Sequence, residues 1–273
     1  MNYDFDRVIP RRPTDSLKWN AYDENVLPLW VADMDFKSPE PVIEALQRRV
    51  AHGIFGYPSS HTEAMQLYEV LVERMLRLYG WQIQAEDILL IPGVVTGLNL
   101  ACQALADPGD GLLIQTPVYM PFLNLASNAG LLPQQMELTC NPDGSYAIDW
   151  EAFEAAFTAE TRLFVLCNPH NPVGRVYTRE ELERMAQICL QKKVIICSDE
   201  IHCDLLFSGQ RHIPIASLDP EIAQNTITLM APSKTYNIAG LQCSFAVVQN
   251  AELRKKLQQA GKGLAGWVNV MGL

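Results

Sequence analysis

The sequence predicts an α/β fold in which a mostly parallel sheet lies between helices. From about residue 85 onward, short β-rich segments alternate with helical patterns, and this alternation is typical of strands joined by crossover helices. The chain has 273 residues, of which 48% are hydrophobic and 19% are charged. This length and composition allow a sizeable core and one large or two modest domains.

Five short apolar runs are predicted to be strands because each is rich in aliphatic or β-branched residues and ends at a turn signal. They cover residues 88–91, 112–115, 162–166, 194–197 and 226–230. Helices are predicted between them over 95–106, 119–129, 150–157 and 178–192. Thr178 and Glu181 form a capping box that opens the last of these helices.

Two helices and an arm are predicted before the first strand. The first helix starts at Ser38 and Pro39 and ends at Gly53. The second covers residues 63–79 and presents an apolar stripe of Leu67, Val70, Leu71, Met75 and Leu78. Residues 1–37 are irregular and rich in Pro, Asp and Trp, so we expect an arm that packs over a domain of residues 38–273.

A last helix is predicted to begin at Ala251 and to continue through Gly-rich turns toward an apolar end at Leu273. Chain termini usually lie at the surface, so this apolar end favours a domain that is incomplete at its C-terminal side.

Charge and composition limit the partners that we expect. The 21 Lys and Arg against 31 Asp and Glu give a net charge of −10, which argues against nucleic acid or an anionic membrane. The chain has no membrane-spanning apolar run and no apolar signal region near its start, so we expect a cytoplasmic protein. Its seven cysteines lack C-x-x-C spacing and its histidines are scattered, so no metal site is predicted.

Sites in open α/β sheets form beyond the carboxyl ends of the strands, so the residues that follow each strand carry the functional hypotheses. Gly93 lets the backbone turn into a helix, and the N–H groups of Val94 and Val95 could then hold a phosphate. A helix that simply begins after a glycine is the commoner case. Tyr119, flanked by prolines, could lie flat over a planar ligand or pack in the core.

Three further segments carry polar side chains at strand ends. Asn171 opens the second of two Asn-Pro pairs, at 168–169 and 171–172, and could offer its amide to a ligand oxygen, or the segment is an ordinary turn. Asp199 ends a buried strand and would suit a protonated ring nitrogen, although it could instead cap a helix. Lys234 lies in a tight, partly apolar turn that could lower its pKa and favour imine formation, although it could be a solvated lysine.

In this order the five segments resemble the fold-type I aminotransferase superfamily of pyridoxal-phosphate (PLP) enzymes. Within it, the sequence is most similar to the MalY/PatB-type carbon–sulfur β-lyases, also called cystathionine β-lyases. The discriminating pieces are Arg-Arg-Pro-Thr-Asp-Ser-Leu-Lys-Trp at 11–19, Trp-Val-Ala-Asp-Met-Asp-Phe at 30–36, Gly-Ile-Phe-Gly-Tyr at 53–57, Asp-Glu-Ile-His at 199–202 and Ala-Pro-Ser-Lys-Thr-Tyr-Asn-Ile-Ala-Gly-Leu-Gln at 231–242.

The resemblance implies a fold-type I large domain without its C-terminal small domain, PLP as cofactor, and a homodimer. It implies that Lys234 binds the cofactor covalently and later moves protons, and that Asp199 keeps the ring nitrogen protonated. The other implied cofactor residues are Gly93, Val94, Val95 and Ser233 at the phosphate, Tyr119 over the ring, Asn171 and His202 near its phenolic oxygen, and Tyr57 at the partner subunit's phosphate. Ala32 and Asn171 would contact the substrate.

The implied activity is β-elimination from L-cystathionine or related cysteine S-conjugates, which yields a thiol, pyruvate and ammonia. Ala231 and Gln242 stand where many relatives carry Ser and Arg at the phosphate, and this departure favours a lyase over an aminotransferase. An aminotransferase stays open as an alternative, and so does a non-catalytic regulatory binding protein or an inactive fragment. The substrate-carboxylate Arg of the family has no counterpart in this sequence.

Overall fold

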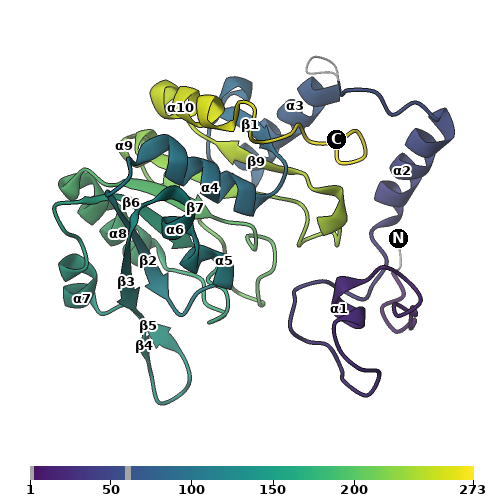
Figure 1. The fold of residues 1–273 in the computed structure, drawn as a ribbon, viewed down its shortest axis with the longest axis horizontal. Helices are drawn as coiled ribbons and strands as arrows, with labels where there is room; N and C mark the ends of the chain where they lie inside the picture. Colours follow the sequence, from purple (N-terminus) through teal and green to yellow (C-terminus); the bar gives the residue numbers. More distant parts are fainter. Residues whose placement is uncertain (1–2, 59–62) are drawn as a thin grey trace.

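The computed structural model describes residues 3–58 and 63–273. Its centre is a seven-stranded sheet in the order β1-β9-β8-β7-β6-β2-β3 (Figure 1). The strands are β1 (Ile88–Ile91), β2 (Gly111–Thr116), β3 (Leu132–Glu137), β6 (Thr161–Cys167), β7 (Ile195–Asp199), β8 (Thr226–Met230) and β9 (Ser244–Val247). β9 is antiparallel to both of its neighbours and every other adjacent pair is parallel. The predicted mostly parallel sheet is therefore confirmed.

Helices cover both faces of this sheet (Figure 1). One face packs against α4 (Val94–Leu105), α6 (Leu125–Ala129) and α10 (Ala251–Gly261), and the other packs against α7 (Trp150–Ala155) and α8 (Arg179–Lys192). Successive residues of a strand point to opposite faces, so Leu112 joins the core on the α4 side and Leu113 joins the core on the α8 side. A third apolar cluster lies between α3 (Glu63–Tyr79) and the β1–β9 edge of the sheet.

The shorter elements complete the fold. They are α5 (Met120–Leu123), α9 (Pro220–Gln224), the hairpin of β4 (Thr139–Cys140) and β5 (Tyr146–Ala147), and 3₁₀ turns over Ala85–Asp87, Ile215–Ser217 and Ala239–Leu241. The capping box that was predicted for α8 is present, because Thr178 accepts from the amide of Glu181 while Glu181 accepts from the amide of Thr178. Within the described residues, none of the helices combines the length and the apolar character that crossing a bilayer requires.

Several predicted elements differ from the structure. The single helix expected over 119–129 is two short helices, α5 and α6, because the amide of Asn124 bonds the carbonyl of Pro121 and tightens the chain there. The apolar stripe of α3 is rotated from the prediction: Leu71 and Met75 are buried, but Val70 and Leu78 are exposed. α10 ends at Gly261, because Lys262 is extended and Gly263 has φ +79°, so the last helix does not continue to the apolar end.

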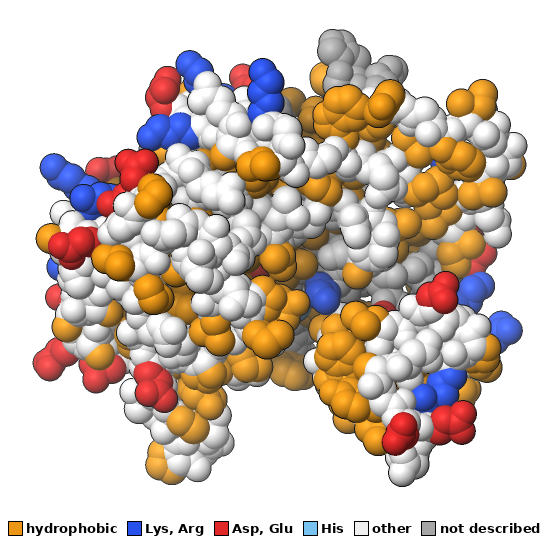
Figure 2. Space-filling model, viewed as in Figure 1, with side chains coloured by type: hydrophobic (Ala, Val, Ile, Leu, Met, Phe, Trp, Pro, Cys, Tyr) orange, Lys and Arg blue, Asp and Glu red, His pale blue; other side chains and the backbone are white. Residues whose placement is uncertain are grey.

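The N-terminal segment lies beside the sheet rather than across it (Figure 1). It contains α1 (Leu17–Asn20) and α2 (Glu40–His52), and Gly53 ends α2 in the left-handed conformation as expected. Pro39 caps the start of α2, whereas the Ser38 hydroxyl donates to the carbonyl of Asn237 instead. α2 has no buried residue, and hydrophobic side chains gather over it and over the arm (Figure 2). The division of the chain after residue 37 stays a prediction.

Candidate active site

Loops that follow strands β2, β6, β7 and β8 meet at one edge of the sheet. Asp199 is the last residue of β7, and its carbonyl accepts a hydrogen bond of 2.9 Å from the amide of Asn168, in the loop after β6. The amide of Glu200 donates to Leu229 of β8 at 2.8 Å. These backbone bonds hold the strand ends in register, so the side chains that follow them project into a common region.

Asp199 places a carboxylate at the buried end of β7. The residue is 5% exposed, and its Oδ1 accepts a hydrogen bond of 3.0 Å from the amide of Ile201. Burial, with a smaller contribution from the neighbouring Glu200, raises the pKa of Asp199 to about 7, although the Ile201 bond and the charge of Lys234 oppose the rise. A positive partner at this carboxylate would relieve the penalty of burying its charge.

Lys234 lies in the turn after β8 and contacts the arm. Its Nζ donates a hydrogen bond of 2.9 Å to the carbonyl of Ala32. Burial lowers the pKa of Lys234, while the charges of Asp33 and Asp199 oppose this shift. A lysine with a lowered pKa carries a larger fraction of free amine near neutral pH, which is the form that attacks an aldehyde or accepts a proton.

Asn171, His202 and Ala32 line one cavity of about 500 Å³, in which they meet although they are far apart in the sequence. Burial lowers the pKa of His202, and Lys234 lowers it further. Tyr119 is 44% exposed, and its amide donates to the carbonyl of Asn171 at 2.9 Å. The structure therefore brings Ala32, Tyr119, Asn171 and His202 together with Lys234 and Asp199.

The first turn of α4 lies after β1. Gly93 has φ +106°, a conformation that glycine adopts without strain, and its amide donates to Ile91 and to the hydroxyl of Ser244. Val94 is buried and Val95 is 39% exposed. The first N–H groups of a helix have no partner within the helix, so a helix start such as that of Val94 and Val95 suits an anion. Ser233 is half-buried directly before Lys234.

Tyr57 does not join this group. It is 87% exposed and packs edge-on against Trp267, with ring centroids 5.1 Å apart. Both rings line a second cavity, of about 870 Å³, whose lining includes neither Lys234 nor Asp199. Among the described residues, no group of three or more His, Cys, Asp and Glu side chains is arranged to hold a metal ion.

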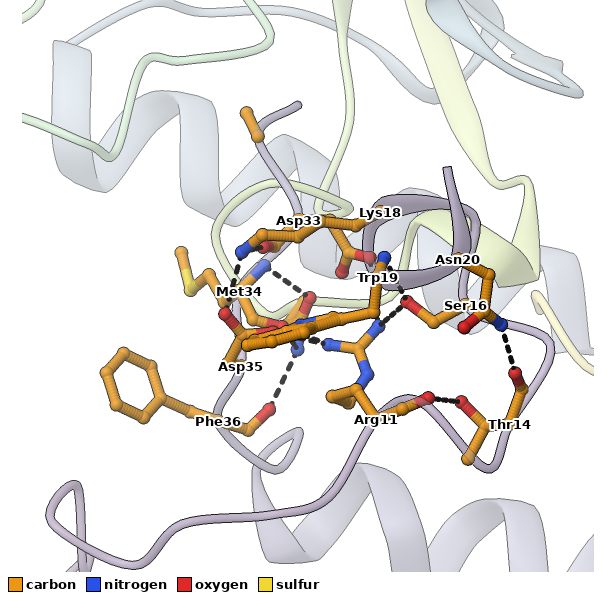
Figure 3. A network of polar contacts seen from close by, with 12 residues as sticks. Arg11, Thr14, Ser16, Lys18, Trp19, Asn20, Asp33, Met34, Asp35 and Phe36 are labelled. Carbon is orange, nitrogen blue, oxygen red and sulfur yellow. Dashed lines mark hydrogen bonds and ion pairs between the residues drawn. The ribbon is translucent and has the colours of Figure 1, made fainter. Parts of the chain in front are cut away.

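A charged network in the arm holds Ala32 near Lys234. The sequence did not predict this network. Figure 3 shows Arg11, Lys18 and Trp19 converging on Asp33 and Asp35. Arg11 contacts Asp33 at 2.9 Å and Asp35 at 3.0 Å, and the other carboxylate oxygen of Asp35 accepts from Lys18 at 2.7 Å. Trp19 donates to Asp35 at 2.7 Å, and Lys18 also bonds the carbonyl of Asp33, next to Ala32.

Asn237, three residues after Lys234, fastens the arm to the lysine loop. Its side-chain oxygen accepts from the amide of Met34 at 3.2 Å, and its side-chain nitrogen donates to the carbonyls of Met34 and Phe36. The residue has φ +55°, which asparagine tolerates better than most residues. The position of Asn237 close to Lys234 was the signal in the sequence for a role at this loop. Its partners could not be predicted, because they lie about 200 residues away in the chain.

A second contact fixes the lysine loop from α3. Arg74 binds the carboxylate of Asp204 with distances of 2.5 and 2.6 Å. The hydroxyl of Thr235 donates to the same carboxylate at 2.9 Å. The turn that carries Lys234 is thus held on one side by Asn237 and on the other by Asp204.

Three comparisons relate the chain to known proteins. The family model described as "Aminotransferase class I and II" matches residues 24–266. The curated "Cystathionine beta-lyase PatB" of Bacillus subtilis is 41% identical over 95% of this chain and 68% of its own length, and "Protein MalY" of Escherichia coli is 29% identical over 97% and 68%. The chain therefore spans about two thirds of the length of these relatives.

Solved structures of PLP-containing proteins are also similar to this chain. Cystalysin from Treponema denticola, a structure that contains pyridoxal 5'-phosphate, superposes with a TM-score of 0.93 at 36% identity, over 100% of this chain and 70% of its own. A PLP-bound C–S lyase from Staphylococcus hominis superposes with a TM-score of 0.90 at 35% identity, over 100% and 69%.

Proposed function

Because the chain belongs to the aminotransferase class I and II family, we propose that it is a PLP-dependent carbon–sulfur β-lyase. The substrate class is L-cystathionine and related cysteine S-conjugates, and the products are a thiol, pyruvate and ammonia. The single observation that carries this proposal is the meeting of Lys234 with the buried Asp199 at the carboxyl ends of two neighbouring strands.

The residues of this edge fit PLP. Asp199 is a carboxylate whose pKa is raised by burial. A protonated ring nitrogen would supply a positive partner that offsets this cost. The N–H groups of Val94 and Val95, with the hydroxyl of Ser233, would hold the phosphate at the start of the 12-residue helix α4. Lys234 would bind the aldehyde covalently.

The remaining cofactor contacts would come from loops beside this edge. Tyr119 would stack on the ring, and Asn171 with His202 would face its phenolic oxygen.

When bound, PLP supplies an electron sink for the electron pair that remains after a Cα–H bond breaks. The Nζ of Lys234 would accept the Cα proton of the substrate, and its lowered pKa favours the free amine that acts as a base. The Cβ–S bond then breaks and its electron pair leaves with the thiolate. The electron pair from the Cα–H bond would form a double bond between Cα and Cβ, and hydrolysis of the remaining fragment would give pyruvate and ammonia.

Two chain residues orient this proton transfer. The carbonyl of Ala32 accepts from Lys234 Nζ at 2.9 Å and holds the amine on the side of the cavity that Asn171 lines. The Asp199 carboxylate would keep a proton on the ring nitrogen and so maintain the electron demand that the elimination needs.

An aminotransferase is the second candidate, because a PLP-bound putative aminotransferase from Clostridium difficile is 37% identical to the chain with a TM-score of 0.94. Gln242, in the left-handed conformation, and Ala231 stand where many transaminases carry phosphate ligands, so the lyase is the first candidate.

The decisive experiment supplies L-cystathionine and PLP without any keto acid and measures pyruvate and free thiol. We expect both products, and we expect Lys234→Ala to reduce their release by about 10²- to 10⁴-fold, the range of a lost general base. Turnover that requires a keto acid would replace the lyase by the aminotransferase. A binding activity that survives Lys234→Ala, without any turnover by the wild type, would support the non-catalytic alternative.

We also propose a homodimer in the cytoplasm, in which Tyr57 reaches the phosphate of the partner subunit. The exposed Tyr57 ring, the large cavity beside it and the lack of buried residues in α2 support a covering partner on this side. Sedimentation at micromolar concentration tests the proposal: a monomer that still binds PLP fully would contradict it.

A further inference from the structure

Behind the proposed cofactor contacts lies a row of buried polar side chains that the proposed mechanism does not use. His170 is 1% exposed, and its Nε2 lies 2.9 Å from the carbonyl oxygen of Pro117. Its Nδ1 lies 2.9 Å from the hydroxyl of Tyr177, and this hydroxyl lies 3.0 Å from the Oε1 of Gln115. Tyr177 is 1% exposed and Gln115 is 2% exposed, so no bulk water reaches the row.

The direction of these hydrogen bonds follows from donor and acceptor chemistry. A carbonyl oxygen only accepts, so Nε2 of His170 must carry the proton that points at Pro117. Burial lowers the pKa of His170 to about 4, so the ring is neutral and Nδ1 is an acceptor. The hydroxyl of Tyr177 must therefore donate to Nδ1, and its single proton is then used.

As the Gln115 amide is oriented, the hydrogen bonds of the row are incomplete. If Tyr177 donates to His170, it cannot also donate to Oε1 of Gln115. Meanwhile Nε2 of Gln115 is buried without a hydrogen-bond partner among the described residues. A half-turn of the amide, which exchanges two atoms of nearly equal size, places Nε2 at the Tyr177 hydroxyl, so that Nε2 donates and the hydroxyl accepts.

The row joins the two loops that would contact the cofactor. Pro117 lies two residues before Tyr119, and His170 directly precedes Asn171. The amide of Tyr119 also donates to the carbonyl of Asn171 at 2.9 Å. Displacing His170 would therefore move both loops relative to each other.

We propose that Gln115, Tyr177, His170 and Pro117 form a one-directional hydrogen-bond chain, with His170 as the Nε2–H tautomer, which positions Tyr119 and Asn171. His170 and Tyr177 are thus positioning residues. The claim about the tautomer stands on the polypeptide alone, whereas the claim about positioning for PLP rests on the proposed function.

The tautomer is tested by ¹⁵N NMR of protein labelled at its five histidines. The signal that disappears in His170→Gln identifies the residue. We expect a neutral ring with protonated Nε2 and a hydrogen-bonded, unprotonated Nδ1 at neutral pH. A protonated Nδ1, or a doubly protonated ring, would overturn the chain, whether or not the protein binds PLP.

The positioning claim is tested with Tyr177→Phe in the PLP-loaded protein. Thr228→Val is the matched control, because Thr228 is fully buried and its hydroxyl has no partner among the described residues. We expect Tyr177→Phe to shift the pH midpoint of the visible absorbance of bound PLP by about one pH unit, because the Asn171 amide moves. Thr228→Val should leave this midpoint unchanged.

The remaining outcomes separate the two claims. A Tyr177→Phe protein with a lower Tm but an unshifted midpoint would show a merely structural hydroxyl and would overturn the positioning role. A wild-type protein that takes up no PLP would overturn the proposed function and the positioning role together, while the NMR result would still decide the hydrogen-bond chain.

Discussion

The sheet and the N-terminal segment are stabilised in different ways. Strands β6 and β8 are almost wholly buried, and the helices on either side add two extensive apolar clusters. Within residues 3–53 the buried residues are Ser16, Lys18 and Pro28, and two of these three are polar. Apolar burial thus stabilises the sheet region, whereas hydrogen bonds and ion pairs hold the arm.

The candidate site lies where these two regions meet. Asp199 is the last residue of β7 and Lys234 lies in the turn after β8, whereas Ala32 comes from the arm. Partly exposed ion pairs contribute little free energy compared with a buried apolar cluster, so we expect the arm to open more readily than the sheet. The two sides of one site can therefore differ widely in local stability.

We expect the same substitution, Phe to Ala, to change the free energy of unfolding far more in the sheet region than in the arm. Phe153 is fully buried and packs edge-on against Trp150, Phe157 and Phe164, whereas Phe5 in the arm is 62% exposed. We expect Phe153→Ala to lower the free energy of unfolding by about 3–5 kcal/mol, and Phe5→Ala to lower it by less than about 1 kcal/mol. Denaturant unfolding measures both, and equal losses would contradict the comparison.

A second test measures how much stability the buried charge of Asp199 costs the folded protein. The pKa of Asp199 rises from 3.8 to about 7 through burial, which corresponds to a penalty on the order of 4 kcal/mol for the charged form. The folded protein keeps a proton that the unfolded chain has released, so the free energy of unfolding falls as pH rises from about 4 to about 7. Above pH 7 the whole penalty remains.

Asp199→Asn removes this penalty, so the PLP-free variant should be more stable than the wild type at pH 8 and nearly equal to it at pH 3. Urea titrations across this range provide the measurement. The same variant should bind PLP more weakly, because the ring nitrogen loses its carboxylate. A constant difference between variant and wild type at all pH values would argue against a strongly raised pKa.

Much of the sheet region could be predicted from its residues because its signals are local. The runs at 88–91 and 226–230 have the predicted bounds, and the capping box of α8 is where the spacing indicates it. β3 was missed because its sequence, Leu-Pro-Gln-Gln-Met-Glu, buries only Met136 and has the polar character of an edge strand. β9 was missed because four residues, Ser-Phe-Ala-Val, become a strand through pairing with β1 and β8.

Some residues of the candidate site could likewise be predicted from local sequence signals, and others could not. Asp199, Asn171 and Lys234 could be predicted because each lies at the end of a recognisable strand or within four residues after it. The arm network could not, because Arg11 meets its carboxylates 22 and 24 residues away and no periodic pattern links them. Tyr57 lies apart from these residues, and its predicted role at the phosphate of a partner subunit stays a proposal.

The smallest expected effect concerns the arm. Asp35 accepts from Arg11, Lys18 and Trp19, and although burial raises its pKa, the bonds from Lys18 and Trp19 lower it overall. The stability that this carboxylate contributes is therefore lost as pH falls below 3.8. Because Asp35 is 37% exposed, solvent screens the pairs and limits their contribution to global stability.

Asp35→Asn should therefore loosen the arm without unfolding the sheet. We expect faster amide hydrogen exchange in residues 11–36, unchanged protection of β6 and β8, and a Tm within a few degrees of the wild type. Asp15→Asn, at an exposed position of the same arm, is the matched control and should change none of these. If Asp35→Asn also deprotects β6 and β8, the arm and the sheet form one cooperative unit. The carbonyl of Ala32 would then be as firmly placed at Lys234 as the strand ends themselves.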